Sequence, residues 1–423
     1  MKFDLLIKGG EVVDTSASLS GKMDVAIRNN IVAAVDRNIP ESAAAQVIKA
    51  ENRIVTPGLI DLHTHVFRGI TFWGIDAEAV GSRTGVTTWV DAGSAGAYTL
   101  PGFREFIVES ATVRIYSFLN IASIGLVGHN YELQNCAFLD VDLFVRMFKL
   151  HSDLIVGAKV RMGTPTVGEN GIEPLKRAKR AARSCGLPLM VHIASGPPSI
   201  MEVVSLLEAG DILTHCFTAQ DMRIIDDSGK IIDAVRRARE AGVIFDIGHG
   251  SGAFAFSVAE PLMEAGHRPD TISTDIHQLS IDGPMFDLPT TLSKFLALGM
   301  TLPEVIHAVT VRPAEILGLE GRLGTLAPGA AADIALFELK RGNFPFYDIE
   351  GHVRYGSELL VNTQTIVDGR PMDRLPEVNP APWMAHDFSE EENFYINTEF
   401  QDELRRCGHV PSAMARDTAE ASD

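Results

Sequence analysis

Eight short apolar runs, separated by helical patterns, constrain the fold of this chain more than any other feature. The runs occupy residues 59–65, 86–92, 115–122, 154–160, 187–193, 212–216, 243–247 and 271–275. Strands that alternate with helices over a long stretch are typical of parallel β/α units rather than of an antiparallel meander. The runs and their helices occupy roughly 260 residues, which is the usual size of a (β/α)8 TIM barrel. We therefore predict an α/β fold with a (β/α)8 barrel over residues 56–319.

The two ends of the chain share a different pattern. Apolar and polar residues alternate around turn signals in the first fifty residues, where Asn29-Asn30 suits a tight hairpin, and the alternation returns in residues 332–337 and 363–367. We expect the ends to pair into one small β-sandwich domain, discontinuous in sequence, over residues 1–55 plus 320–375. A C-terminal extension, residues 376–423, is Pro-rich and then acidic, and its end is predicted to be disordered.

The charge of the chain bears on its partners. There are 37 Lys and Arg against 55 Asp and Glu, and the net charge of −18 repels phosphate backbones and anionic lipid surfaces. We expect no nucleic-acid and no membrane partner, whereas a homo-oligomer is compatible with the sequence. Asp4 and Lys8 interrupt the apolar stretch that a secretory signal requires, and no run of about eighteen apolar residues occurs. The expected location is the cytoplasm.

Polar side chains fall at the C-terminal ends of the apolar runs. His63 and His65 end the first run, and residues two apart on a strand point to one face, so both imidazoles can reach one metal. Four further polar residues end later runs: Lys159, His192, His215 and Asp275. Counted from His63, the successive separations are 96, 33, 23 and 60 residues. At roughly 25 to 33 residues per β/α unit, these are steps of three, one, one and two units, which brings all six groups to one barrel mouth.

This constellation resembles the amidohydrolase superfamily, whose barrel members carry HxH on strand 1, a carboxylated lysine on strand 4, histidines on strands 5 and 6, and an aspartate on strand 8. The resemblance covers nearly the whole chain and includes residues 55–61 and 324–333, which flank the barrel. It implies two divalent metal ions and carbon dioxide held as a carboxylate on the lysine. The implied ligands are His63, His65 and Asp275 for the first metal, His192 and His215 for the second, and carboxylated Lys159 as a bridge.

Such a ligand set suits hydrolysis. Two dications about 3.5 to 4 Å apart repel, so the site needs an anionic bridge, and the ammonium form of Lys159 would not provide one. Imidazole and carboxylate ligands make zinc the expected metal, although manganese, iron and cobalt suit the same ligand types. The resemblance implies attack by a metal-bridging hydroxide, with Asp275 as the catalytic residue that passes a proton to the leaving group.

Departures from subfamily patterns narrow the reaction. Deaminases of this superfamily usually lack the strand 4 lysine and carry a glutamate three residues after the strand 5 histidine, where this chain has Ser195. D-aminoacylases have a cysteine ligand after strand 2, which is absent from residues 90–94. Bacterial dihydroorotases hold the substrate carboxylate with an arginine at the position of Phe67, and Arg68 comes one place late. A shift of one residue along a strand reverses the direction of the side chain.

The chain is therefore most similar to the dihydroorotase-like amidohydrolase/deacetylase group. The implied reaction cleaves an acyl ester or amide of a small anionic carboxylate, such as an N-acyl amino acid or an O-acetyl hydroxy acid. A cyclic amidohydrolase that opens a ring amide, such as a dihydroorotase, is the first alternative. A non-catalytic dihydropyrimidinase-like scaffold is the second, and the intact ligand set favours an enzyme over it.

Substrate-binding residues are expected in the loops after the strands. The polar and cationic candidates there are Arg68, Ser94, His129, Asn130, Tyr131, Arg161, His249 and His277. Several have an alternative role: Arg161 could pair with an acidic neighbour, and the histidines could support the metal ligands instead of touching substrate. The glycine-rich residues 248–252 match neither a Walker loop nor a dinucleotide fingerprint.

Overall fold

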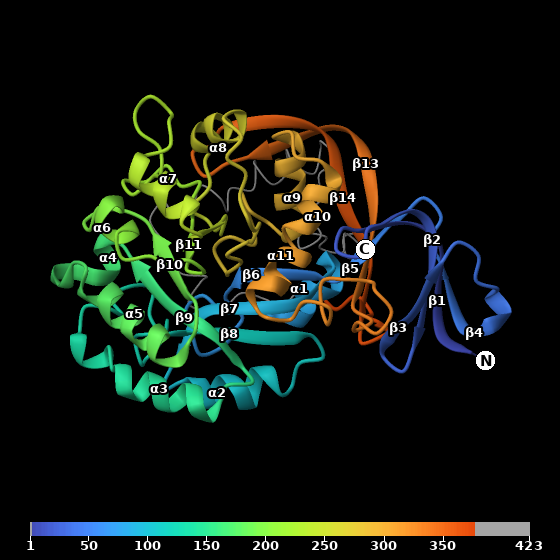
Figure 1. The fold of residues 1–423 in the computed structure, drawn as a ribbon, viewed down its shortest axis with the longest axis horizontal. Helices are drawn as coiled ribbons and strands as arrows, with labels where there is room; N and C mark the ends of the chain where they lie inside the picture. The colour runs from blue at the N-terminus through green and yellow to red at the C-terminus, as the bar shows by residue number, and fades with distance from the viewer. Residues whose placement is uncertain (1, 377–423) are drawn as a thin grey trace, which may run out of the picture.

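A computed structural model describes residues 2–376, and two sheets organise them (Figure 1). The first sheet has seven strands in the order β12-β11-β10-β9-β8-β7-β6, and all neighbours are parallel. Its strands are β6 (Leu59–Thr64), β7 (Val86–Gly96), β8 (Arg114–Asn120), β9 (Ile155–Met162), β10 (Leu189–Ile193), β11 (Ile212–Thr214) and β12 (Ile244–Asp246). They coincide with the first seven apolar runs, and the α/β class is confirmed.

The eighth predicted run forms no regular strand. It makes isolated parallel bridges instead, from Thr271 to β12 and from Ile276 to β6. The amide of Asp275 also donates to the carbonyl of His63 at 2.7 Å. Because Asp275 has a φ of 49°, outside the β region, regular pairing cannot continue through it. Residues 271–276 thus link the last strand of the sheet to the first.

Helices follow the strands, and α2, α3 and α5 run along the outside of the parallel sheet (Figure 1). The helices are α1 (Ala77–Thr84), α2 (Leu100–Phe103), α3 (Val141–Leu150), α4 (Thr164–Val167), α5 (Glu173–Cys185), α6 (Ile200–Val204), α7 (Asp233–Glu240), α8 (Phe256–Glu264), α9 (Leu288–Ala297), α10 (Leu302–His307) and α11 (Val311–Ile316). Local sequence sets their ends. Asp140 caps α3 by accepting from the amide of Leu143, and α5 stops at Gly186, whose φ is 66°.

The second sheet contains strands from both ends of the chain. Its order is β15-β14-β13-β5-β1-β2-β3, and β4 pairs with β1. The strands are β1 (Phe3–Asp14), β2 (Leu19–Arg28), β3 (Ile31–Asp36), β4 (Ala44–Lys49), β5 (Ile54–Pro57), β13 (Ile334–Tyr347), β14 (Val353–Val367) and β15 (Arg370–Pro371). Buried aliphatic side chains from both ends, such as Ile7, Val25 and Ile366, form one core.

The two C-terminal strands are longer than predicted. Beyond the shared sheet, β13 and β14 continue until Phe346 and Leu360 enter the core of the parallel sheet. The amide of Leu360 donates to Ser293 Oγ of α9 at 3.0 Å. The exposed, charged stretch around Lys340 breaks the apolar alternation, and for this reason the sequence pattern suggested shorter strands. The predicted extension lies, apart from residue 376, outside the described residues.

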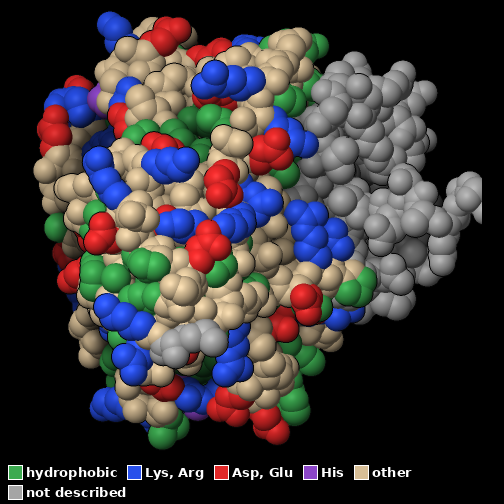
Figure 2. Space-filling view, turned by 90° about the vertical axis from the view of Figure 1, so that its right-hand side faces the viewer, with side chains coloured by type: hydrophobic (Ala, Val, Ile, Leu, Met, Phe, Trp, Pro, Cys, Tyr) green, Lys and Arg blue, Asp and Glu red, His purple; other side chains and the backbone are tan. Residues whose placement is uncertain are grey.

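Charges of both signs cover the face at the right-hand side of Figure 1. Figure 2 shows Lys and Arg side chains interspersed with Asp and Glu and with small hydrophobic groups on that face. Within residues 2–376, no helix combines the length and the apolar character that crossing a bilayer requires.

Candidate metal centre

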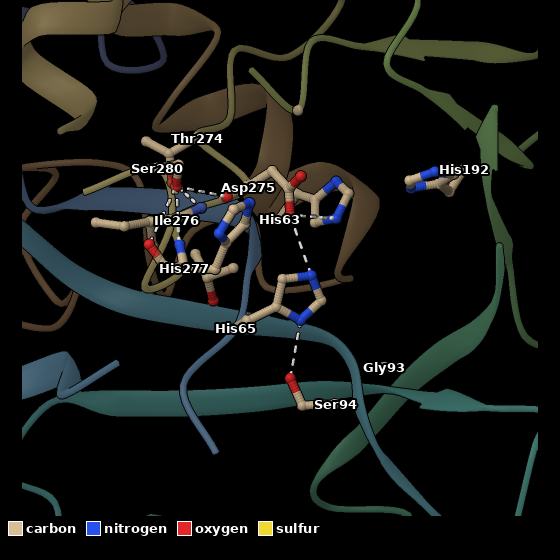
Figure 3. A network of polar contacts seen from close by, with 12 residues as sticks. His63, His65, Gly93, Ser94, His192, Thr274, Asp275, Ile276, His277 and Ser280 are labelled. Carbon is tan, nitrogen blue, oxygen red and sulfur yellow. Dashed lines mark hydrogen bonds and ion pairs between the residues drawn. The ribbon is translucent and has the colours of Figure 1, made fainter. Parts of the chain in front are cut away.

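Three of the predicted ligands meet at the C-terminal end of β6. The Nε2 atoms of His63 and His65 lie 3.3 and 3.0 Å from Asp275 Oδ1. The ligand atoms of these three residues all lie within 4.8 Å of one another, and all three side chains are buried. Figure 3 shows both imidazoles beside the Asp275 carboxylate. His63 and His65 point to the same side because side chains alternate along β6. The bridge between β6 and residues 271–276 brings Asp275 beside them.

The outer nitrogen of His63 is held by a hydroxyl. His63 Nδ1 lies 2.8 Å from Thr214 Oγ1, and Thr214 Oγ1 donates to Asp246 Oδ2 at 2.7 Å. A hydroxyl has only one proton, and here it points to the carboxylate, so His63 Nδ1 must be the donor in its contact with Thr214. The Nε2 atom of His63 therefore presents a lone pair to Asp275.

The outer nitrogen of His65 has an equivalent partner. His65 Nδ1 lies 2.8 Å from Ser94 Oγ (Figure 3), and the Ser94 hydroxyl also interacts with the Asp91 carboxylate. Burial lowers the pKa of His65 to about 3 and that of His63 well below its usual value, so both rings are neutral at pH 7. Among the described atoms, Asp275 Oδ1 has no hydrogen-bond donor. Three acceptors thus face one another without a proton between them, which suits a divalent cation.

The other three predicted ligands lie alongside this cluster. His215 Nε2 is 2.6 Å from His192 Nδ1 and 4.0 Å from Asp275 Oδ2. The Nζ of Lys159 lies 2.9 Å from His63 Nε2, and within residues 2–376 it has no carboxylate at ion-pair distance. Burial lowers the pKa of Lys159 to about 7. The structure therefore brings together all six side chains that the spacing predicted.

Three glycines let the backbone approach these groups closely. A Cβ on Gly93, whose φ is +92°, would lie 2.6 Å from Cγ of Lys159. One on Gly250, at φ +51°, would lie 2.5 Å from Asp275 Oδ2. A Cβ on Gly248, whose φ is +48°, would lie 2.8 Å from His63 Nδ1 and 2.9 Å from His215 Nδ1. The glycine-rich residues 248–252 therefore form a tight wall of the site, a role that sequence reasoning missed.

Three substrate-binding candidates surround Trp73, which follows β6. The Trp73 ring centroid lies 4.7 Å from that of His277 and 4.9 Å from that of His129. The Arg161 guanidinium carbon lies 5.6 Å from the same ring, and Arg161 forms a buried bidentate pair with Glu132 at 2.7 and 3.0 Å. The Trp73 Nε1 is buried and unpaired within the described chain. Sequence reasoning missed both Trp73 and Glu132, because neither follows a strand end in a recognisable motif.

Three further candidates lie toward the surface. Arg68 is 45% exposed in its side chain and lies 3.7 Å from Asp76. Asn130 Nδ2 lies 3.3 Å from His129 Nδ1, and Tyr131 is exposed. Within residues 2–376, these residues make no hydrogen bond or ion pair to the predicted ligands.

His249 has a different environment from the other candidates. It is completely buried, stacks on Phe254 at 4.6 Å between ring centroids, and its Nε2 lies 2.8 Å from Lys294 Nζ. Lys294 also donates to the carbonyls of Pro284 and Tyr347 at 2.7 Å. These contacts anchor His249 in the core and hold the glycine-rich residues 248–252 in place.

Comparison with known proteins identifies the family. Residues 54–372 match the family described as "Amidohydrolase family". The chain belongs to this family. A protein named "Deacetylase" from Enterococcus faecalis is 35% identical to this amidohydrolase over 376 residues, which are 88% of this chain and 100% of that protein. A "Deacetylase" from Brucella anthropi is 37% identical over 330 residues, 77% of this chain and 81% of the relative.

Solved structures agree on the family and differ in name. A structure named as an adenine deaminase superposes with a TM-score of 0.82 at 35% identity, covering 88% of this chain and 100% of its own. A structure named as a dihydroorotase gives 0.80 at 34% identity, covering 87% and 98%. This amidohydrolase is therefore a hydrolase, as predicted, with a fold of the TIM-barrel type that these neighbours share.

Proposed function

We propose that this amidohydrolase is a binuclear metal-dependent deacetylase that cleaves an acyl ester or amide of a small carboxylate. N-acyl amino acids and O-acetyl hydroxy acids are the proposed substrates. The observation that carries the proposal is the buried cluster of acceptors formed by His63, His65 and Asp275 beside the amine of Lys159, which lacks a carboxylate partner in the described structure. Two similar proteins named deacetylase support the same reaction.

The proposal includes a complete barrel. We infer that residues 271–276 act as its eighth strand, since they bridge β12 and β6. The barrel would span residues 56–319, and residues 1–55 plus 320–375 would form the small β-domain. The shared eight-stranded sheet supports this division.

The chain offers ligands for two cations, with zinc as the first choice because imidazole and carboxylate ligands suit it. His63, His65 and Asp275 would hold one, and His192 and His215 the other. Bound metals would supply an acidified water and polarise the scissile carbonyl. The neutral amine of Lys159 can add to carbon dioxide and lose one proton, which gives the anionic carbamate that two cations require between them.

Asp275 has the position of a proton carrier. Its Oδ1 faces the imidazoles, and its Oδ2 lies against the glycine wall near Gly250. In the proposed reaction, the carboxylate takes the proton of the attacking water and delivers it to the departing nitrogen or oxygen. The absence of a side chain on Gly250 leaves the room that this carboxylate occupies.

The substrate carboxylate is proposed to bind on the side of Trp73. The unpaired indole N–H, His277 and the Arg161–Glu132 pair lie there, and Arg68 lies near the rim. Methyl esterification of the substrate should then reduce kcat/KM by about 10²-fold or more, because a charge-assisted contact would be lost.

A direct assay tests the proposed function. One preparation, loaded with zinc and bicarbonate, is offered N-acetyl amino acids, O-acetyl hydroxy acids, dihydroorotate and adenine, with Asp275→Asn as the inactive control. Acetyl compounds should be hydrolysed well. Efficient turnover of dihydroorotate would instead support the cyclic amidohydrolase alternative, to which the dihydroorotase-named structure points. Turnover of adenine is not expected, since Ser195 takes the glutamate position of deaminases and donates to Gln220.

Elemental analysis provides a second test. The protein should carry close to two divalent metals per chain, because the ligands form two groups joined by Lys159. One metal would indicate a mononuclear enzyme. None at all would favour the non-catalytic scaffold.

A further inference from the structure

Asp246, at the end of β12, is a buried carboxylate that belongs to neither predicted ligand group. Its carboxylate accepts three hydroxyl hydrogen bonds, from Thr214 at 2.7 Å, Thr271 at 2.6 Å and Ser273 at 2.7 Å. It is completely buried. A buried charge of this kind persists only when it is well hydrogen-bonded, and three donors from two separate segments provide that.

We propose that Asp246 is a positioning residue for both halves of the metal centre. It acts on His63 through the Thr214 hydroxyl and on His215 through Ser273 and the backbone of Gly248. Each arm makes the outer nitrogen of the imidazole a hydrogen-bond donor, so that the inner nitrogen keeps the lone pair needed to bind a metal.

The His63 arm depends on the Thr214 hydroxyl. His63 Nδ1 lies 3.8 Å from Asp246 Oδ2, too far for a direct hydrogen bond, and Thr214 Oγ1 bridges them with contacts of 2.8 and 2.7 Å. Because the Thr214 proton points to Asp246, His63 Nδ1 must carry a proton and donate it to Thr214 Oγ1, and this sets the tautomer of His63. Removing the hydroxyl would free the ring to rotate or to place its proton on Nε2.

The His215 arm runs through backbone. Ser273 Oγ accepts from the Gly248 amide at 3.0 Å and donates to Asp246, which holds Gly248 from its N-terminal side. On its C-terminal side, the amide of His249, in the same peptide as the Gly248 carbonyl, donates to the Ser273 carbonyl at 3.1 Å. The Gly248 carbonyl then accepts from His215 Nδ1 at 2.6 Å. A side chain on Gly248 would collide with both arms, because its Cβ would lie 2.8 Å from His63 Nδ1 and 2.9 Å from His215 Nδ1.

Thr271 provides a matched control. Its hydroxyl donates to Oδ1 of the carboxylate that the other two hydroxyls also contact, and within the described residues it makes no hydrogen bond to an imidazole. Thr214→Val and Thr271→Val each remove one hydroxyl that donates a hydrogen bond to the Asp246 carboxylate. Only Thr214→Val also removes a hydrogen-bond partner of a predicted ligand, His63.

Metal affinity is the first readout, measured by chelator competition on protein reloaded with zinc. Thr214→Val and Ser273→Ala should each weaken binding of one metal by about 10- to 100-fold. Thr214→Ser should restore the affinity, and Thr271→Val should leave it close to that of the wild type. Equal affinities for Thr214→Val and Thr271→Val would overturn the inference. If Thr214→Val does not fold, Ser273→Ala against Thr271→Val makes the same comparison.

The ring tautomer is the second readout. The metal-affinity measurement rests on the proposed function, whereas the tautomer can be measured without metal. Nitrogen-15 NMR of labelled histidines in the metal-free protein should show His63 and His215 protonated at Nδ1. Thr214→Val should change the His63 pattern and leave that of His215 unchanged. A metal-free wild type with His63 protonated at Nε2 would overturn the inference. Absence of metal binding with the expected tautomers would overturn the proposed function alone.

Discussion

Gly250→Ala tests whether the position of Asp275 controls catalysis. At φ +51°, Gly250 adopts a left-handed conformation, and an added Cβ would lie 2.5 Å from Asp275 Oδ2. A methyl carbon and a carboxylate oxygen need more than 3 Å, so one of them has to move by several tenths of an ångström at least. We expect the Asp275 carboxylate to move, since its Oδ1 has no hydrogen-bond donor among the described residues, whereas the Gly250 amide is held by the Thr274 carbonyl at 2.7 Å.

The size of the effect follows from two terms. An alanine in the left-handed region costs about 1 to 2 kcal/mol of stability relative to glycine. A displacement approaching 1 Å in a reacting group can lower the rate by about 10²-fold. We therefore expect a variant that folds, with a denaturation midpoint only slightly reduced, and with kcat about 10- to 100-fold lower while KM changes little.

Gly252→Ala is the control for this experiment. It lies in the same wall, its φ is outside the left-handed region, and its Cβ would meet only Gln220 Nε2 at an ordinary 3.4 Å. Both variants are compared with wild type in the acetyl-hydrolysis assay and in urea unfolding followed by circular dichroism. Wild-type kcat in Gly250→Ala, or an equal loss of activity in Gly252→Ala, would show that the position of Asp275 does not control catalysis.

Three further predictions concern charge. Lys159→Ala should remove the proposed bridge and abolish most activity, with partial rescue by a short carboxylic acid in the assay, and full activity would refute the bridge. Arg161→Met should destabilise the protein by about 3 to 5 kcal/mol in urea unfolding, because it leaves Glu132 buried without its partner; Arg161→Met/Glu132→Gln should recover much of this. The metal-free protein should lose stability as pH falls from about 6.5 toward 4. Burial lowers the pKa values of His65 and His215 in the folded protein to about 3 and 4, so the unfolded chain binds protons in this pH range that the folded protein does not. Urea midpoints at pH 7, 6 and 5 measure this, and a midpoint independent of pH would contradict it.

Much of the candidate centre could be predicted because its six side chains follow simple periods in the sequence. His63 and His65 share a face because strand side chains alternate, and the other ligands follow at whole multiples of a β/α unit. The parallel sheet confirms seven of the eight apolar runs as strands. The run at residues 271–275 differs because Asp275 leaves the β region where it turns toward the imidazoles.

The groups that support the ligands could not be predicted in this way. Thr214 and Asp246 look like ordinary residues at strand ends, and only the pairing of β11 with β12 brings Thr214 beside Asp246. Glu132, which neutralises Arg161, lies in a loop between β8 and α3 that has no period. The glycine-rich sequence around Gly248 and Gly250 is easy to recognise. The need for glycine there depends on side chains such as His63 and Asp275, which come from distant parts of the sequence.

The different names of similar proteins suggest where substrate selection resides. The predicted ligands stand at the ends of strands or in the bridging segment, and relatives at 34 to 35% identity share the fold at TM-scores of 0.80 and above. Trp73 and His129 come instead from loops after β6 and β8, which can vary without disturbing the sheet. Exchanging ligands should therefore remove catalysis altogether, whereas exchanging Trp73 or His129 should change KM and the order of preferred substrates. A comparison of substrate profiles between such loop variants and the wild type distinguishes the two kinds of residue directly.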